Sequence, residues 1–375
     1  MTLNLSMPTA AFELKPKITV VGVGGAGGNA VNNMIKQNLE GVEFIVANTD
    51  AQALSQSLCQ RRIQLGQNLT AGLGAGSRPD VGRAAAEEAL DEIIRQLQGS
   101  NMVFITAGMG GGTGTGGAPI VAGIAKEMGA LTVGVVTRPF EFEKLNRANI
   151  ADQGIQEMRK AVDTLLVIPN QRLLDILDAE TTTESAFRMA DDVLRKSIQS
   201  ISDVITTPGE INMDLNDIRA VMKDAGEALI GMGEASGPGR AINAAKAAIH
   251  SPLLENVVMD GAKGLIVNVT GRRNTMKLAE MEEAMALITG AASQYAKIKA
   301  GHAYDEAMGD VLRITVIATG FPARRGNRNL SRAGLTGATA RRHPLDAPDP
   351  SDSRTSAPED WSKPAFMRLK VRKLK

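Results

Sequence analysis

The sequence predicts an α/β fold with a mainly parallel N-terminal sheet, a long central helix, a smaller α+β C-terminal domain and a disordered tail. Three observations lead to this prediction. Short β-rich runs alternate with helical patterns through the first half of the 375 residues. One long helical pattern follows, and after Pro322 the composition changes to Arg, Ala, Ser, Pro, Asp and Gly without apolar periodicity.

The alternation in the first half is typical of right-handed βαβ units, with helices on both faces of a parallel sheet. We expect strands at 18–23, 42–47, 63–65, 102–106, 131–136 and 164–168. We expect helices at 29–37, 81–98, 118–128 and 144–162.

The central helix is expected at about 182–205, where Pro208-Gly209 stops it. Phe187, Leu194 and Ile201 are among the apolar residues that recur at helical spacing, so much of its length should be buried. After it we expect helices at 214–224, 241–248 and 277–290, and strands at 264–269, 296–299 and 311–318.

These patterns divide the chain into six parts. They are a flexible N-terminus (1–15), a nucleotide-binding domain (16–181), the central helix (182–207), the C-terminal domain (208–322), a disordered linker (323–360) and a terminal peptide (361–375).

The charge distribution argues against general nucleic-acid binding. Residues 1–322 carry 29 Lys and Arg against 36 Asp and Glu, so the body of the protein is acidic and lacks the basic patch that a nucleic acid needs. Six arginines gather in 323–343, and six basic residues without an acidic one in 361–375.

The sequence also argues against a disulfide-bonded, zinc-binding, secreted or membrane-spanning protein. Cys59 is the only cysteine, so no disulfide forms within the chain, and His250, His302 and His343 match no zinc spacing. The first 12 residues lack a signal peptide, and no stretch approaches 18 apolar residues. We therefore expect a cytoplasmic protein without a membrane span.

Three glycine-rich loops follow strands, at 22–29, 72–77 and 108–117; the last contains seven glycines and two threonines in ten residues. Glycine leaves backbone N–H groups open to a ligand, and a helix N-terminus attracts an anion. No Lys-Ser or Lys-Thr follows the glycines, so this phosphate cradle is not a Walker loop. A tight turn that only helps helix and strand to pack is the alternative for each loop.

The loops and several motifs together resemble the FtsZ family, the bacterial relatives of tubulin that form the division ring. The matching segments are 48–50, 110–116, 139–147, 186–192 and 211–217, and the resemblance extends over about 16–322. It implies a tubulin-like GTPase domain that binds GTP and GDP, with Mg²⁺ held mainly through water, so that we name no protein ligand for the metal.

The resemblance assigns a role to each motif residue. Backbone amides of Gly25 to Gly28 and of the third loop surround the phosphates, and the threonine hydroxyls of that loop donate to them. Glu143 accepts from the ribose, and Arg147 balances phosphate charge or stacks near the nucleotide. Phe187 offers a face to the base, and Asp191 accepts two hydrogen bonds from guanine, which adenine cannot donate. The implied GTP-binding residues are Gly25, Ala26, Gly27, Gly28, Asn29, Gly110, Gly111, Gly112, Thr113, Gly114, Thr115, Glu143, Arg147, Phe187 and Asp191.

Catalysis is implied to come from a neighbouring copy. Asn212, Asp214 and Asp217 lie just after the central helix, and head-to-tail stacking would bring them to the γ-phosphate of the next subunit. Such a contact does not close, so it builds a filament. Simpler readings stay open: core packing for Phe187, a solvated charge for Asp191, and helix-dipole acids for Asp214 and Asp217.

The terminal peptide Pro364-Ala365-Phe366-Met367-Arg368 resembles the family segment that docks on membrane tethers and regulatory division proteins at mid-cell. Lys363 stands where an aliphatic residue is common, and a basic extension follows, which could touch anionic lipid.

Two other functions compete. The first loop satisfies G-x-G-x-x-G through Gly22, Gly24 and Gly27, as in NAD-binding oxidoreductases, but Asp50 lies 28 residues beyond Gly22 rather than about 20. The second alternative is a tubulin-like structural protein that assembles without hydrolysing GTP.

Overall fold

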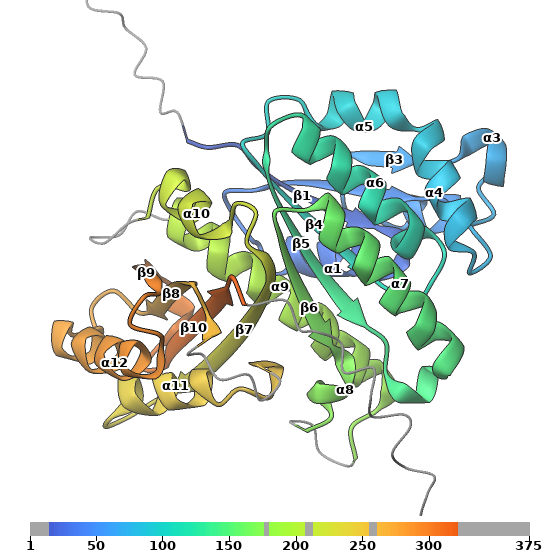
Figure 1. The fold of residues 1–375 in the computed structure, drawn as a ribbon. Helices are drawn as coiled ribbons and strands as arrows, with labels where there is room; N and C mark the ends of the chain where they lie inside the picture. The colour runs from blue at the N-terminus through green and yellow to red at the C-terminus, as the bar shows by residue number, and fades with distance from the viewer. Residues whose placement is uncertain (1–14, 176–179, 207–212, 255–260, 322–375) are drawn as a thin grey trace, which may run out of the picture. The chain divides into compact units, whose positions relative to one another are not determined.

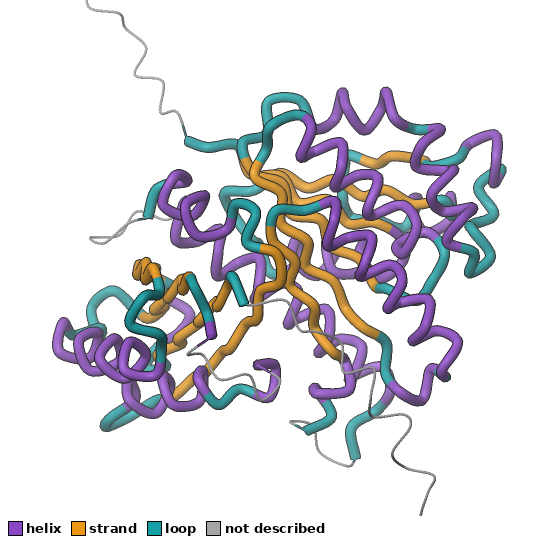
Figure 2. The backbone as a smooth tube through the Cα atoms, in the orientation of Figure 1, coloured by secondary structure: helices purple, strands orange, loops and turns teal. Residues whose placement is uncertain are grey.

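The computed structural model describes residues 15–175, 180–206, 213–254 and 261–321 (Figure 1). Their strands form one ten-stranded sheet in the order β3-β2-β1-β4-β5-β6-β7-β10-β8-β9. Figure 2 shows these strands as a central layer with helices to either side. The predicted terminal segments, and the partner-binding residues Pro364 to Arg368, lie outside the described residues.

The first six strands are parallel, as the alternation predicts. They are β1 (Ile18–Val23), β2 (Glu43–Asn48), β3 (Arg62–Gln64), β4 (Met102–Gly108), β5 (Leu131–Arg138) and β6 (Thr164–Pro169). All six positions of β1 are buried, because helices cover both faces of the sheet and each face needs apolar side chains.

Successive strand residues point to opposite faces, so the sheet separates two cores. Val20 of β1 packs in a cluster with α1 (Gly24–Lys36) and α9 (Thr183–Thr206), whereas Val21 packs in a cluster with α6 (Thr113–Glu127) and α7 (Leu145–Ala161). The remaining helices of this half are α2 (Ala51–Ser55), α3 (Gln67–Thr70), α4 (Pro79–Glu88), α5 (Leu90–Leu97) and α8 (Asn170–Leu173), with a 3₁₀ turn at Glu141–Glu143.

Two helices begin inside the glycine loops rather than after them. α1 begins at Gly24 and α6 at Thr113, where the sequence predicts 29 and 118. Glycine is a poor helix former, but close packing decides here: a Cβ on Gly27 would lie 2.4 Å from the carbonyl oxygen of Thr106. The loops are therefore first helical turns, with their amides at the helix ends.

The helix predicted at 81–98 is two helices, which separate at Ala89. There the carboxylate of Glu88 accepts hydrogen bonds from the backbone N–H groups of Asn68 (2.9 Å) and Leu69 (3.2 Å). These hydrogen bonds connect the point where α4 ends to the short helix α3.

The central helix α9 has 24 residues, which at about 1.5 Å per residue makes it about 36 Å long. Its buried stripe includes Val193, Leu194 and Ile201, as predicted. It connects the two halves of the described chain.

The second half contains a mixed sheet. Its elements are α10 (Leu215–Met222), β7 (Gly226–Ala235), α11 (Arg240–Ile249), β8 (Gly264–Gly271), α12 (Leu278–Ala291), β9 (Lys297–Tyr304) and β10 (Leu312–Thr319), with 3₁₀ turns at Pro252–Leu254 and Glu306–Met308. β10 is antiparallel to β7 and β8, β9 is parallel to β8, and β7 joins β6 in parallel.

Strand β7 is absent from the sequence prediction, because its sequence GEALIGMGEA is rich in glycine, which is poor in strands. The glycines serve packing. A Cβ on Gly231 or Gly233 would lie 2.1 Å from the carbonyl oxygen of Ala248 or Ala244 in α11. The small residues thus let a helix lie directly on the strand.

Among the described helices, none combines the length and the apolar character that a membrane span needs.

Candidate functional site

The carboxyl ends of β1, β4, β5 and β6 meet at one edge of the sheet, where parallel α/β proteins bind ligands. The segments that follow these strands line two neighbouring pockets. Asp191 of α9 lies in the wall of both.

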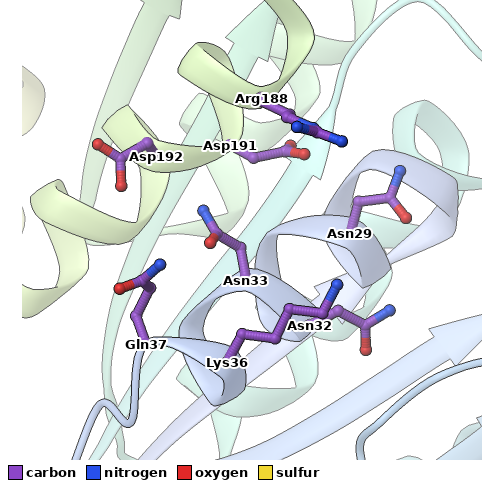
Figure 3. Close-up of a pocket in the computed structure, with 8 residues that line it drawn as sticks. All are labelled: Asn29, Asn32, Asn33, Lys36, Gln37, Arg188, Asp191 and Asp192. Carbon is purple, nitrogen blue, oxygen red and sulfur yellow. The ribbon is translucent and has the colours of Figure 1, made fainter. Parts of the chain in front are cut away.

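The larger pocket lies between α1 and α9 and has a volume of about 520 Å³. Figure 3 shows Asp191 and Arg188 of α9 across from Asn29 and Asn33 of α1. Its complete lining is Asn29, Asn32, Asn33, Lys36, Gln37, Arg188, Asp191 and Asp192. These side chains are polar or charged, so the pocket suits a ligand with many hydrogen-bonding groups.

The smaller pocket, of about 60 Å³, brings together residues that are far apart in the sequence. Of the predicted nucleotide residues it contains Ala26, Glu143, Arg147, Phe187 and Asp191. The other lining residues are Gly108, Met109, Thr137, Pro139, Asn170 and Ala190. Five predicted residues from three separate segments of the sequence therefore share one site.

Burial raises the pKa of Asp191 to about 7. A carboxyl group with this pKa is partly protonated at neutral pH. A ligand that donates hydrogen bonds to the carboxylate would favour the ionised form, so Asp191 is suited to recognise a pair of donors.

Phe187 lines the smaller pocket and belongs to an aromatic cluster. Its ring centroid lies 5.4 Å from that of Phe140 and 6.3 Å from that of Phe142, both in edge-to-face geometry. Phe187 remains 40% exposed, although Phe140 is buried. Part of the Phe187 ring is therefore open to a flat ligand.

Glu143 and Arg147 are held next to each other. The Glu143 carboxylate accepts a hydrogen bond from the backbone N–H of Phe140 (2.9 Å) and lies 3.2 Å from the Arg147 guanidinium. The Glu143 side chain is 9% exposed, whereas that of Arg147 is 53% exposed. Glu143 is therefore fixed, and Arg147 can reach toward a ligand.

The third glycine loop has one open side and one packed side. A Cβ on Gly111 would meet no atom within 4 Å, but on Gly112 it would lie 2.8 Å from the Ala75 side chain. Gly110 has φ +106°, a backbone conformation that favours glycine. Gly25 in the first loop is open in the same way as Gly111.

The remaining glycines of the two loops are closely packed. Gly114 approaches Gly24 so nearly that a Cβ on Gly24 would lie 2.9 Å from the Gly114 nitrogen, and Gly27 abuts Thr106. A Cβ on Gly28 would make ordinary contact, at 3.5 Å, with Val46. The N-terminal turns of α1 and α6 are thus joined side by side.

The two threonines of the third loop brace it. The hydroxyls of Thr113 and Thr49 are 2.6 Å apart, and the Thr115 hydroxyl accepts from the Gly110 N–H at 2.9 Å. Thr115 is buried, whereas Thr113 is half-buried. Of the two hydroxyls, that of Thr113 is nearer to solvent.

The second glycine loop is fastened to residues 48–50. The N–H of Ala51 donates to the Gly72 carbonyl, and that of Gly74 donates to the Thr49 carbonyl. Asp50 caps α2 by accepting from the N–H groups of Gln52 (2.8 Å) and Ala53 (3.2 Å). Asp50 thus has a structural role as the N-cap of α2.

Asp214 and Asp217 lie at the start of α10. Asp214 is the N-cap, and the two residues form a capping box, in which each carboxylate accepts from the backbone N–H of the other. The ammonium of Lys299 lies 2.6 Å from Asp217 Oδ1 and lowers the pKa of Asp217. Asn212 lies outside the described residues.

These acids and the pockets lie at opposite edges of the sheet. The C-terminal end of α10 lies at the amino ends of the strands: Met222 accepts from the Thr164 hydroxyl at the start of β6, and Arg219 donates to Asn101, just before β4, at 3.4 Å. The pockets begin at Gly108, the last residue of β4. A seven-residue strand is about 23 Å long at about 3.3 Å per residue, so about this distance separates the two ends of β4.

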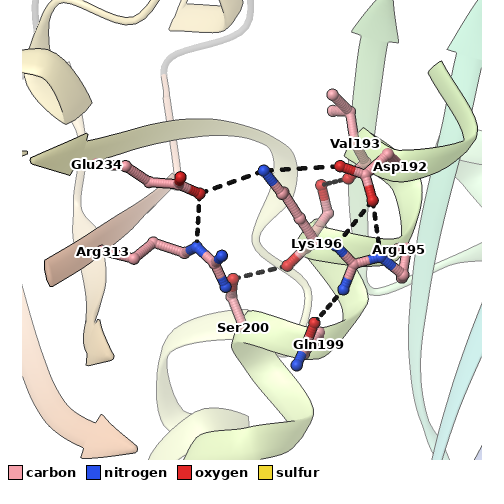
Figure 4. Close-up of polar contacts among 9 residues, drawn as sticks. Asp192, Val193, Arg195, Lys196, Gln199, Ser200, Glu234 and Arg313 are labelled. Carbon is pink, nitrogen blue, oxygen red and sulfur yellow. Dashed lines mark hydrogen bonds and ion pairs between the residues drawn. The ribbon is translucent and has the colours of Figure 1, made fainter. Parts of the chain in front are cut away.

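A chain of charges connects the larger pocket with the second half of the protein (Figure 4). Lys196 lies 3.6 Å from Asp192, which lines the pocket, and 3.2 Å from Glu234 of β7. Glu234 also pairs with Arg313 of β10 at 2.7 Å. These pairs fix the face of α9 that contacts β7 and β10.

Several pocket residues are absent from the predicted set of GTP-binding residues. Asn32, Asn33 and Lys36 accompany Asn29 on α1, and Arg188 accompanies Asp191 on α9. Their helical spacing was the available signal, since residues three and four apart share a helix face. Asn170 had no such signal, because only the tertiary fold brings it to the pocket.

The Asn170 Oδ1 atom gives a test of fit for a polar ligand. It is buried, lies in a residue of the smaller pocket, and has no hydrogen-bond partner among the described residues. An unpaired buried acceptor is costly, so it points to a donor supplied by a ligand. No group of three or more His, Cys, Asp or Glu among the described residues could hold a metal ion.

Two family models match the chain. The Tubulin/FtsZ family GTPase domain matches residues 17–178, and the FtsZ family C-terminal domain matches residues 226–322. The chain belongs to the FtsZ family. The resemblance drawn from the glycine loops and the tubulin-like α/β fold are both confirmed, and the chain is thus a member of a family of GTPases.

Curated FtsZ relatives are about 50% identical to the chain over the region that matches. The cell division protein FtsZ of Magnetospirillum gryphiswaldense is 54% identical over 84% of the chain, and that of a Wolbachia species is 52% identical over 88%. The matched region spans 56% of the length of the first relative and 86% of the second.

Solved structures of FtsZ and of CetZ1 have the same fold as the chain. An FtsZ dimer from M. jannaschii, 42% identical, superimposes with a TM-score of 0.78 over 82% of this chain and 88% of its own. CetZ1 from Haloferax volcanii, bound to GDP, is 19% identical with a TM-score of 0.71 over 82% of this chain and 95% of its own, and shares the fold.

Proposed function

We propose that the chain binds GTP at the carboxyl edge of its sheet, assembles head to tail into filaments, and hydrolyses GTP at the junction between subunits. The observation that carries this proposal is the separation of the pockets from Asp214 and Asp217, which lie at opposite edges of one sheet. The FtsZ dimer from M. jannaschii and the names of the curated relatives support an assembly in cell division.

Guanine is the base that the pocket suits. Asp191 accepts from two adjacent N–H donors of guanine, Asn29 lies opposite, and the exposed part of Phe187 contacts the base. Glu143 accepts from ribose hydroxyls. The unpaired Asn170 oxygen supports a donor-rich ligand in the smaller pocket.

The phosphates meet the N-terminal turns of α1 and α6. Gly25 and Gly111 are the open glycines of these turns, and their packed neighbours hold the amides in place. The Thr113 hydroxyl donates to a phosphate oxygen, Thr115 supports the loop, and Arg147 balances charge. Bound Mg²⁺ would neutralise phosphate charge, mainly through its waters.

Hydrolysis needs a second copy. Asp214 and Asp217 of one subunit orient and polarise the attacking water at the γ-phosphate of the next, and Asn212 helps to position the junction. Because this contact is heterologous and does not close, it produces an open filament. We place this filament in the ring at the mid-cell septum, where residues 364–368 dock on membrane tethers and regulatory division proteins.

A mixing experiment tests the junction directly. Asp191→Ala removes the guanine acceptor but keeps the acids, whereas Asp214→Asn keeps the pocket but removes an acid. Each variant alone should release little phosphate from GTP. In an equal mixture about one quarter of the junctions combine an intact pocket with intact acids, so phosphate release should partly return.

A mixture that stays as inactive as its components would contradict hydrolysis across a junction. Dilution gives a second check: phosphate release per molecule should rise steeply with protein concentration, and a rate independent of concentration contradicts the proposal. An unmodified chain that sediments with GTP but releases no phosphate would instead support the non-hydrolysing alternative.

A further inference from the structure

Lys299 lies in β9, which is the edge strand of the ten-stranded sheet, and it pairs in register with Ile266 of β8. Nothing in the sequence marks it, because a lysine in a strand is usually a solvated edge residue. In the structure its ammonium lies 2.6 Å from Asp217 Oδ1, 82 residues away in the sequence.

With this contact, both carboxylate oxygens of Asp217 have a hydrogen-bond donor. Asp217 Oδ1 receives the ammonium of Lys299, and Oδ2 receives the backbone N–H of Asp214 at 3.3 Å. The Asp214 carboxylate, in contrast, accepts from the Asp217 N–H at 2.7 Å and has no ion pair with a described residue. Asp217 is thus the anchored acid of the pair.

We propose that Lys299 is a positioning residue, whose ammonium holds the Asp217 carboxylate, and through the capping box the turn at Asp214, in the orientation that hydrolysis at the junction requires. This inference rests on the proposed function. Lys299 also places a positive charge beside the Asp217 carboxylate, which approaches a triphosphate at the proposed junction, and so reduces the repulsion between that carboxylate and the phosphates.

Stability alone does not account for the contact. The side chains of Lys299 and Asp217 are 41% and 34% exposed, and ion pairs that are this open to solvent contribute little to the free energy of unfolding. Orientation has larger consequences, since a misplacement of about 1 Å can lower a rate by about 100-fold. The effect of Lys299 should therefore be seen in turnover.

The test compares four variants: Lys299→Met, Lys299→Arg, Asp217→Asn and the double variant Lys299→Met/Asp217→Asn. Lys297→Met is the matched control, because Lys297 lies two residues earlier, on the same side of β9, and is exposed. Phosphate release is measured per sedimented subunit, so that a change in assembly is separated from a change in turnover.

We expect Lys299→Met to lower turnover by about tenfold and Lys299→Arg to restore most of it. Lys297→Met should match the unmodified chain. Since the ammonium lowers the pKa of Asp217, its removal should also move the acid limb of the pH–rate profile to higher pH, which a merely structural residue would not do. The double variant should be no slower than Asp217→Asn.

Unchanged turnover and pH profile in Lys299→Met, beside a slow Asp217→Asn, would overturn the positioning role and leave hydrolysis at the junction intact. A double variant slower than Asp217→Asn would also overturn it, because Lys299 would then act independently of Asp217. If Asp217→Asn hydrolyses GTP normally, the proposed function itself fails, which is a different result.

Discussion

The carboxylates of Asp214 and Asp217 each accept a hydrogen bond from the backbone N–H of the other residue, at 3.3 Å to Asp217 Oδ2 and 2.7 Å to Asp214 Oδ1. This reciprocal arrangement begins α10 and fixes the turn at its start. A structural role for these acids at the start of α10 is therefore compatible with a role in hydrolysis. A mutation must be chosen that affects one of these two roles and not the other.

Replacing Asp214 in two ways separates the cap from the charge. Asp214→Ala loses the cap, so unfolding should require about 1 kcal/mol less free energy, and turnover should fall. Asp214→Asn keeps a capping oxygen, so its stability in urea should stay near that of the unmodified chain while turnover falls. Both should bind GTP normally, and weak binding would place Asp214 in its own subunit's pocket.

Asp191 should make guanine-nucleotide binding depend on pH. Burial raises its pKa to about 7, so the free protein holds a proton there in mildly acidic solution, whereas guanine requires an acceptor. Affinity for a fluorescent GDP analogue should therefore increase between pH 6 and about pH 8.

Asp191→Asn is the control, because an amide oxygen accepts without titrating. The nucleotide phosphates titrate equally with both proteins, so the difference between the two pH profiles belongs to Asp191. Parallel profiles would show that Asp191 does not contact the base.

Asp203 should reduce stability at neutral and alkaline pH. Burial, with a smaller contribution from Asp305, raises its pKa to about 7, while Gln199, Arg313 and Arg195 oppose the shift. The folded chain therefore holds this proton more tightly than the unfolded chain. The stabilisation is present below about pH 4 and is lost as pH rises to about 7.

Asp203→Asn should consequently raise the free energy of unfolding at pH 8, by about 1–2 kcal/mol, and have little effect near pH 4. Urea unfolding at both pH values measures the difference. Asp152→Asn, which removes an exposed acid that pairs with Arg138, is the control substitution. An equal effect of Asp203→Asn at both pH values would show that burial does not penalise its charge.

Adjacent glycines of the third loop should respond differently to alanine. In Gly112→Ala the new Cβ would lie 2.8 Å from the Ala75 side chain and 2.9 Å from the Arg78 nitrogen, so the folded protein should be destabilised. In Gly111→Ala it would meet no atom within 4 Å, so folding should be normal while GTP binding weakens. Thermal unfolding and nucleotide titration of both variants test this, and normal GTP binding by Gly111→Ala would remove that face from the phosphate site.

Much of the fold follows from local patterns. The parallel strands β1, β4 and β5 are buried apolar runs with glycine close to their ends, and α9 carries its apolar stripe over 24 residues, so these elements can be predicted from the sequence. Strand β7 could not be predicted in this way. Its residues Gly231 and Gly233 allow the backbone of α11 to approach closely, and glycine also weakens the sequence pattern of a strand. Tertiary packing also turned the glycine loops into the first turns of α1 and α6.

The candidate site shows the same division. Residues such as Glu143 and Phe187 belong to sequence motifs that are typical of the family and can be recognised from the sequence. Asn170 and Lys299 do not, because their significance depends on partners brought close only by the folded sheet. A single sequence contains no local signal for such long-range contacts.

In the proposed head-to-tail filament, the placement of the pockets and of Asp214 and Asp217 at opposite edges of one sheet would make the two ends of any row of subunits chemically different. One terminal subunit holds a nucleotide that no acid reaches, and the other presents acids with no nucleotide beneath them. A row of n subunits then contains n − 1 complete sites. GTP turnover per subunit would then rise from about one half of its maximum in a pair toward the full maximum in a long row. The length of a row would therefore determine how fast its subunits hydrolyse GTP.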